Sequence, residues 1–212
     1  MYTVRVEFTV PPGNIIQFEE AAARMGTAER AQRGIQGFSV WNSVGSPTKY
    51  AFLVRAESRE ALNKMRRTDA FRIAASAVTA VANLSRPPEV YEVVFDTGNA
   101  GGPFLRLTEW NVIGGPEGAA AFEARSRQMA ELHQKAITGW IGTRVRRSLA
   151  APNRYLTMRY GSTLEAAQPV KDPPAIQDFR RSNPPDKYTS QVSADTFESV
   201  FAIGPRGRRV TR

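Results

Sequence analysis

The chain has 212 residues, of which 42% are hydrophobic and 23% charged, and its formal net charge is +9 at pH 7. This composition is ordinary for a soluble globular protein and allows one large or two small domains. The absence of Cys excludes disulfides and thiolate metal sites. The single histidine, His133, excludes a multi-histidine metal site within one chain.

The first half of the chain predicts a mixture of strands and helices. Apolar and polar residues alternate in segments that read as strands, at residues 4–10, 38–44, 50–56 and 89–95. The spacing of apolar residues predicts helices at residues 15–33, 59–65 and 71–81. Ser58 is a suitable N-cap for the second helix, and Pro87-Pro88 should end the third before the last strand begins.

The second half repeats this order. Corresponding residues are separated by between 102 (109 − 7) and 106 (197 − 91) positions, and the separation changes only where loops are expected. The corresponding pairs are Glu7 and Glu109, Phe18 and Phe122, Gly37 and Gly139, Tyr50 and Tyr155, and Tyr91 and Phe197. A period of about one hundred residues is too long for a solenoid repeat, so the pattern indicates a duplicated domain.

The repeat sets the expected domain boundaries. Residues 1–98 form the first repeat, residues 99–103 a linker, residues 104–204 the second repeat and residues 205–212 a basic tail. The tail contains Gly, Pro and four arginines but little to bury, so we expect it to lie outside both cores, either mobile or bound to a partner. Assembly with another protein, or with a second copy of the chain, through this tail is one use for its charge.

The N-terminus begins directly with a strand pattern. It has no basic segment followed by a long apolar one, so we expect no signal peptide. No uninterrupted apolar stretch approaches the roughly 18 residues of a membrane helix. The expected location is cytoplasmic.

Each repeat reads strand–helix–strand–strand–helix–strand, the βαββαβ order of the ferredoxin-like fold. Right-handed crossovers place the first and third strands side by side and both helices on one face of the sheet. Trp41 puts a large apolar side chain on the other face, which needs cover. The predicted fold class is therefore α+β: two tandem ferredoxin-like units packing sheet to sheet as an intrachain α+β barrel.

Strand-to-helix segments in both halves are similar to those of a known family. They are residues 54–62 and 68–71 in the first half and residues 156–166 in the second. On these segments the chain resembles the dimeric α+β barrel proteins, and within them the antibiotic biosynthesis monooxygenase group, as a fused tandem. The resemblance implies oxygenation of an activated phenol or quinol without metal or flavin, or haem degradation in one branch.

The haem-degrading branch uses an Asn on the first strand, a Trp ending the third strand and a His on the second helix. Here the third strands end in Arg55 and Arg159, and neither second helix carries a His. Only Asn111 on the first strand of the second repeat matches that pattern. The resemblance therefore favours the cofactor-independent branch, and we expect no metal, haem or flavin.

A repeated pair of charged residues is the most informative candidate site. Glu7 and Glu109 occupy the same place on the first strands, and Arg55 and Arg159 the same place on the third strands. Because these strands are neighbours, we expect ion pairs between Glu7 and Arg55 and between Glu109 and Arg159. Such pairs either fix strand register or form a polar anchor, in which Arg binds an anionic or phenolic ligand and Glu takes a proton.

Other candidates are aromatic. One set of side chains either lines a ligand cavity or belongs to the core: Trp41, Phe52, Trp110, Trp140 and Tyr160. His133 lies beside the buried stripe of its helix, where it is either a surface or boundary residue, or else a catalytic base or the axial ligand of a haem.

Two functions remain open. The first is a cofactor-independent monooxygenase acting on an aromatic, quinol or polyketide-like small molecule. The second is a non-catalytic ligand-binding or assembly module of the same fold. A cavity on the order of several hundred Å³ with an entrance would favour the enzyme. The glycine-aromatic signature of RNA-recognition modules is missing from residues 50–56, which argues against a nucleic-acid partner.

Overall fold

The computed structural model describes residues 1–99, 101–184, 188–203 and 209–211. The chain divides into two compact units, which we call unit 1 (Met1–Tyr91 with Glu198–Arg212) and unit 2 (Glu92–Phe197). Their limits differ from those of the predicted repeats because two long strands, β4 (Asn83–Gly98) and β8 (Thr189–Ile203), each contribute residues to both units.

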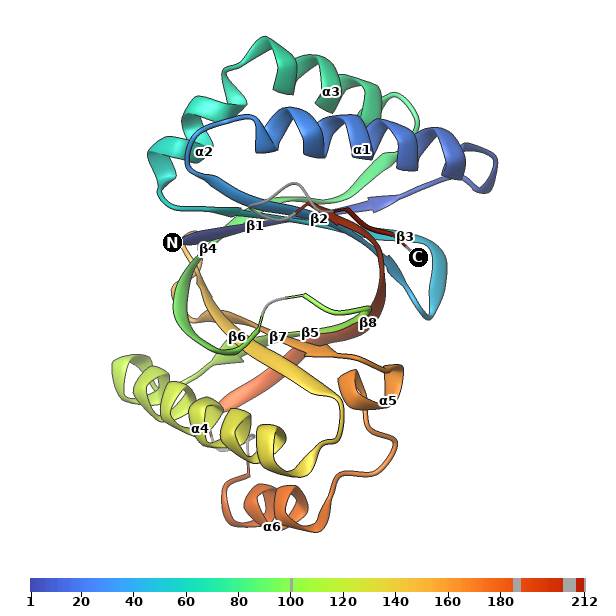
Figure 1. Ribbon diagram of the computed structural model, residues 1–212. Helices are drawn as coiled ribbons and strands as arrows, with labels where there is room; N and C mark the ends of the chain where they lie inside the picture. Colours follow the sequence, from blue (N-terminus) through green and yellow to red (C-terminus); the bar gives the residue numbers. More distant parts are fainter. Residues whose placement is uncertain (100, 185–187, 204–208, 212) are drawn as a thin grey trace. The chain divides into compact units, whose positions relative to one another are not determined.

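Unit 1 is a sheet covered on one face by helices (Figure 1). Besides parts of β4 and β8, its strands are β1 (Tyr2–Thr9), β2 (Ile35–Ser43), β3 (Ser46–Ala56) and β9 (Arg209–Thr211). Its helices are the short 3-10 turn η1 (Pro12–Asn14), α1 (Ile15–Arg30), α2 (Arg59–Arg66) and α3 (Asp69–Thr79). The hydroxyls of Ser58 and Thr68 cap α2 and α3 by accepting hydrogen bonds from the backbone N–H groups of Ala61 and Phe71.

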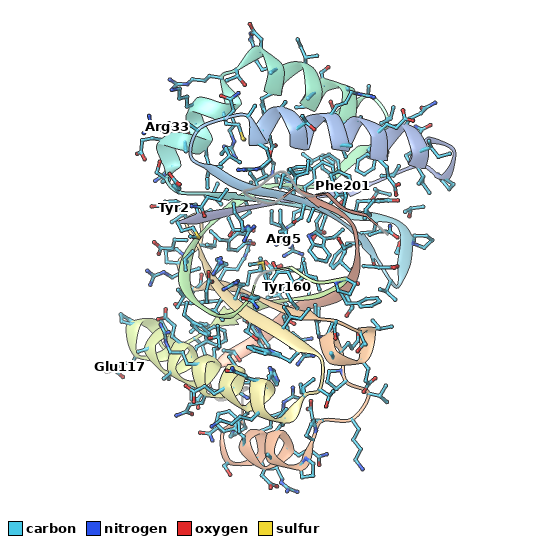
Figure 2. The ribbon with its side chains drawn as sticks, in the orientation of Figure 1. Tyr2, Arg5, Arg33, Glu117, Tyr160 and Phe201 are labelled. Atoms are coloured by element: carbon cyan, nitrogen blue, oxygen red, sulfur yellow. The ribbon has the colours of Figure 1, made fainter. Side chains whose placement is uncertain are left out.

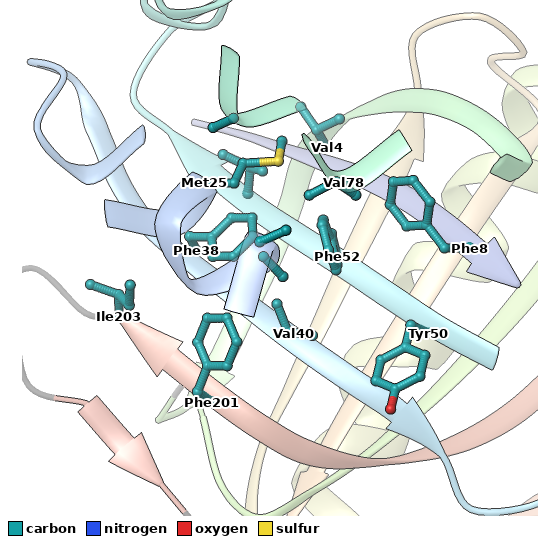
Figure 3. Close-up of a cluster of buried hydrophobic side chains, with 14 of the residues drawn as sticks. Val4, Phe8, Met25, Phe38, Val40, Tyr50, Phe52, Val78, Phe201 and Ile203 are labelled. Carbon is teal, nitrogen blue, oxygen red and sulfur yellow. The ribbon is translucent and has the colours of Figure 1, made fainter. Parts of the chain in front are cut away.

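The core of unit 1 is filled by aromatic and aliphatic side chains between the sheet and α1 and α3 (Figure 3). The Phe8 ring centroid lies 4.8 Å from that of Phe52, and Phe18 contacts both Phe8 and Tyr50. Strand residues alternate between the two faces, so Arg5 lies on the face away from the helices (Figure 2).

Unit 2 has the same element order. Besides parts of β4 and β8, its strands are β5 (Phe104–Val112), β6 (Trp140–Ser148) and β7 (Arg154–Gly161). Its helices are α4 (Gly115–Ala136), α5 (Leu164–Ala167) and α6 (Pro174–Ser182). The hydroxyl of Thr163 caps α5 as Ser58 caps α2. Among its described residues, buried apolar side chains under the helices form one cluster around Phe122 and Tyr155 and another around Ile137 and Ile176.

The strands are hydrogen-bonded in the order β2-β3-β1-β4-β6-β7-β5-β8-β9, and β2 also pairs with β8. The fold class is therefore confirmed: α+β, with two ferredoxin-like βαββαβ units in tandem and the closed strand order of a dimeric α+β barrel. Within the described residues, no helix has the length and apolarity needed to cross a membrane.

Three local predictions were wrong. Strand β4 begins at Asn83 and continues through the exposed Pro87 and Pro88, which the extended backbone accommodates. The predicted counterpart of Gly37, Gly139, lies before β6. The actual counterpart is Gly142, because Gly37 and Gly142 each pair with the second-last residue of the neighbouring strand, β3 or β7. In the tail, Arg209–Thr211 pair with the end of β8, whereas residues 204–208 and 212 lie outside the described residues.

Candidate functional site

Unit 2 contains a cavity of about 560 Å³ between its sheet and its helices. Side chains from β5, β6, β7 and β8 line one side, and α4 with Arg180 of α6 lines the other. His133 and Arg159 are buried, whereas Arg180, Ser190 and Gln191 are exposed. The cavity therefore extends from solvent to a buried polar region, and its volume suits a small organic ligand.

Strand register explains why unit 2 has this cavity and unit 1 is filled. Trp110 is paired with Tyr155 as Phe8 is paired with Tyr50. Two residues further along, Thr157 is therefore the counterpart of Phe52. Because a threonine replaces a phenylalanine that packs in the centre of unit 1, space opens between β7 and α4.

The same register shows where charge replaces apolar packing. Arg106 and Arg159 are direct neighbours across β5 and β7, and their counterparts in unit 1 are Val4 and Val54, which also face each other. Both valines belong to the filled core of unit 1. Two aliphatic core positions in one unit are therefore two cationic cavity positions in the other.

Arg159 is a buried cation whose hydrogen-bond partners are uncharged. Its guanidinium donates from Nε to the carbonyl oxygen of Ala167 at 2.7 Å, with a second bond from Nη2 to the same oxygen. Its Nη1 lies 3.3 Å from Nε2 of His133. Burial, and then the charge of Arg106, lower the pKa of Arg159 to about 10, so it remains protonated at neutral pH.

His133 is held as a neutral donor. Burial, and then the charges of Arg159 and Arg180, lower its pKa to about 3. Because Arg159 carries N–H groups only, Nε2 of His133 must accept, which leaves the proton of the neutral ring on Nδ1. Within the described part of the chain, Nδ1 has no hydrogen-bond partner. In this arrangement His133 offers an N–H group to a ligand and is a poor general base.

Further cations lie towards solvent. Arg125 donates from Nε to the carbonyl oxygen of Asn183 at 2.9 Å, and Arg180 forms an ion pair with Asp172 at 2.5 Å. Burial lowers the pKa of Arg125 and of Arg106. No carboxylate among the described residues is in ion-pair contact with Arg106, Arg125 or Arg159. The cavity therefore has an excess of positive charge.

The apolar part of the cavity comes from Trp110, Phe122, Met129 and Ala130. The Trp110 indole donates from Nε1 to the hydroxyl of Thr157 at 3.2 Å, which fixes the orientation of its ring. The ring centroids of Trp110 and Phe122 are 6.2 Å apart. An aromatic surface beside a cationic one suits a planar ligand that carries a negative charge.

The predicted ion pairs are wrong, although all four residues lie on the expected strands. Glu7 is paired across β1 and β3 with Ala51, whereas Arg55 is paired with Thr3, four residues away along β1. The carboxylate of Glu7 instead contacts Arg5, a partner whose side chain is also buried, and Lys49 at 3.6 Å.

In unit 2 the error has a second cause. Arg159 is the counterpart of Val54 and not of Arg55, so it faces the helices, while Glu109 lies on the other face of its sheet. Glu109 contacts Arg154 at 3.4 Å and accepts a hydrogen bond from Ser193. Of the repeated charged residues, the cavity therefore contains only Arg159.

The remaining candidates are mostly outside the cavity. His133 and Trp110 line it. Asn111 and Tyr160 lie on the sheet face away from α4, where Figure 2 shows Tyr160. Trp140 packs beside the Ile137 cluster and donates to Thr143 at 3.2 Å. In unit 1, Trp41 is buried with its indole N–H bound to Ser39, and Phe52 is in the aromatic core.

Sequence reasoning missed Arg106, Arg125, Arg180 and Thr157 as lining residues. A signal was present for two of them: Arg106 and Thr157 are polar at positions where the other repeat has Val4 and Phe52. Comparing the repeats for loss of apolar character, in place of shared charge, would have identified these positions.

In the described part of the chain, no group of three or more His, Asp or Glu side chains could hold a metal ion. The site is defined by guanidinium groups, hydroxyls and aromatic rings on a ferredoxin-like unit. It lies between the sheet and the helices of one unit of an α+β barrel protein.

Comparisons with known proteins agree with this fold. The family model for antibiotic biosynthesis monooxygenase matches residues 1–77. The chain is therefore a tandem α+β barrel protein that is similar to the antibiotic biosynthesis monooxygenases, as the strand-to-helix segments predicted. A search of curated proteins finds no match.

Three solved structures share the fold over nearly the whole chain. A candidate monooxygenase from Lactobacillus acidophilus is 11% identical with a TM-score of 0.73, and the match covers 99% of each chain. One from Fusobacterium nucleatum is 9% identical with a TM-score of 0.78, covering 100% of this chain and 97% of the other. An anthrone oxidase-like protein is 16% identical with a TM-score of 0.68, covering 99% and 95%. At these identities the three structures show a shared fold.

Proposed function

We propose that the protein is a cofactor-independent monooxygenase that oxidises a phenolic, quinol or anthrone-like molecule in the unit 2 cavity. The observation that carries this proposal is the excess of guanidinium groups beside an aromatic wall. The similarity to the antibiotic biosynthesis monooxygenases and to an anthrone oxidase-like protein supports the reaction class.

The cavity can promote this chemistry by stabilising the ionised substrate. Among the described lining residues there is no Asp or Glu to act as a base, and Nε2 of His133, the nitrogen that could take a proton, already accepts a hydrogen bond from Arg159. Arg106 and Arg159 would instead lower the pKa of a bound phenol or anthrone, so that its proton passes to solvent. Trp110 would stack against the ring and hold it at a fixed angle to these cations.

The electron-rich anion is then the reductant for dioxygen. One electron passes from the anion to O₂, and the resulting radicals combine to form a carbon–oxygen bond and a peroxide. Protonation of the peroxide and loss of water leave a carbonyl group, so that a CH₂ group and O₂ give C=O and H₂O. One oxygen atom enters the product and the other enters water, and the substrate supplies all the electrons.

The test is oxygen consumption by the purified full chain with 1,8-dihydroxyanthrone, measured with an oxygen electrode and by quinone absorbance. We expect one O₂ consumed per quinone formed, at a rate proportional to enzyme and unaffected by a metal chelator. The variant Arg181→Met, which removes an exposed charge next to Arg180 and lies outside the cavity lining, should consume oxygen at the same rate as the unmodified protein. If the protein binds phenolic, quinol or anthrone-like compounds but consumes oxygen with none of them faster than buffer alone, the alternative function is favoured, a non-catalytic ligand-binding module.

A further inference from the structure

Two arginines stand directly opposite each other on the cavity face of the sheet. Arg106 of β5 is paired with Arg159 of β7. Side chains at paired positions on neighbouring antiparallel strands lie about 5 Å apart at Cβ, and like charges in such positions destabilise a sheet. An anion bound between the two guanidinium groups would offset this repulsion, so the arrangement suits a cavity that binds an anion.

Neighbouring protein groups only partly satisfy this pair. Arg159 is 9% exposed and donates to the Ala167 carbonyl and to His133, both uncharged. Arg106 donates to the hydroxyl of Thr196 at 3.3 Å. Asp172 and Asp195 act on these arginines at longer range, and Asp172 is bound to Arg180. Both guanidinium groups therefore retain donors and charge that a ligand can use.

A third donor lies beside them. His133 is 7% exposed, lines the same cavity, and has an Nδ1 atom without a partner among the described residues. A buried N–H group without an acceptor is costly, so this atom independently indicates that an acceptor is missing. Two cations and one neutral donor together suit an oxyanion with several lone pairs.

We propose that Arg106, Arg159 and His133 bind a carboxylate of the ligand, and that the substrates are aromatic carboxylic acids. This inference rests on the proposed function only in placing the ligand in the unit 2 cavity. The rings of Trp110 and Phe122 provide the surface for the aromatic part. A small inorganic anion would leave that surface uncovered, which is why an aromatic acid fits better than phosphate.

The experiment is isothermal titration calorimetry of the full chain with 1-hydroxy-2-naphthoate, its neutral carboxamide, 1-naphthol and inorganic phosphate. We expect the acid to bind about 10- to 100-fold more tightly than the carboxamide or naphthol, the effect of charge-assisted hydrogen bonds. Arg106→Met should remove that preference while leaving the weak binding of naphthol. Arg181→Met, a matched charge control outside the cavity, should retain the preference.

Equal affinity for the acid and its carboxamide in the unmodified protein would overturn the proposal, whether or not Arg106→Met folds. Phosphate binding as tightly as the naphthoate would overturn the assignment to aromatic acids. A strong preference for the acid without any oxygen uptake would contradict the monooxygenase function and leave the carboxylate site standing. The two proposals therefore fail separately.

Discussion

Replacing Glu29 with Gln should raise the free energy of unfolding by about 3–5 kcal/mol at pH 9 and leave it nearly unchanged at pH 4. Glu29 lies near the end of α1, is completely buried, and neither carboxyl oxygen has a hydrogen-bond partner among the described residues. Burial raises its pKa from 4.5 to about 8, and the charge of Arg66 offsets only part of this effect.

The sign follows from proton uptake. Because the pKa of Glu29 is raised in the folded state, the folded protein holds a proton that the unfolded chain releases between about pH 4.5 and pH 8. The stability contributed by the protonated carboxyl is complete below pH 4.5 and is lost as the pH rises through 8. Gln at this position cannot ionise, so the variant should lack this loss.

Denaturant unfolding at a series of pH values measures the effect. The matched control is Glu20→Gln, which changes an exposed carboxylate on the same helix and should follow the unmodified protein at every pH. If Glu29→Gln and the unmodified protein lose stability equally between pH 5 and pH 9, Glu29 is not the buried acid that we describe.

Replacing Arg159 with Met should reduce oxygen uptake and naphthoate binding by about 100-fold or more, while the free energy of unfolding changes by no more than about 1 kcal/mol. Two effects on stability oppose each other. Removing a desolvated cation, whose pKa burial lowers to about 10, stabilises the fold by roughly 3 kcal/mol. Losing its bonds to the Ala167 carbonyl costs about the same.

Turnover, calorimetric binding and denaturant unfolding on one preparation of Arg159→Met separate a site residue from a structural one. Arg154→Met provides a control on the same strand, since Arg154 contacts Glu109 and does not line the cavity. A variant that retains binding, or one that loses binding only because it has lost several kcal/mol of stability, would contradict the role assigned to Arg159.

The fold was predictable because it follows from short-range patterns. Alternation located β1 and the ends of most strands, and the capping hydroxyl of Ser58 located the start of α2. The order of these elements, found twice, then predicts the ferredoxin-like units. The extension of β4 through Pro87 and Pro88 was not predicted, because proline usually ends a helix or strand, whereas here it fits the extended backbone of the strand.

The site was only partly predictable because it depends on pairing register. The likeness of Arg55 and Arg159 suggested that they are equivalent, but the pairing makes Val54 the counterpart of Arg159. Since strand side chains alternate between faces, an error of one residue moved Arg159 to the wrong side of its sheet. The burial of His133 could also have been read from the repeat. At the separation of Phe18 and Phe122, its counterpart on α1 is Glu29, which is buried as well.

The family match and the cavity lie in different units. Residues 1–77, which match the antibiotic biosynthesis monooxygenase model, belong to the unit whose core is filled. The cavity belongs to unit 2, where Thr157 and Arg159 replace apolar residues. We therefore propose that unit 2 binds the ligand and that unit 1 provides structural support.

Filling the cavity tests this assignment most directly. Thr157→Phe introduces the residue that unit 1 has at the counterpart position, Phe52. Calorimetric titration of this variant with 1-hydroxy-2-naphthoate should show affinity reduced by more than about tenfold, the effect of a steric conflict in the cavity. The unmodified protein should bind one naphthoate per chain. Undiminished binding by a folded Thr157→Phe variant, or two equivalent sites per chain, would contradict the account.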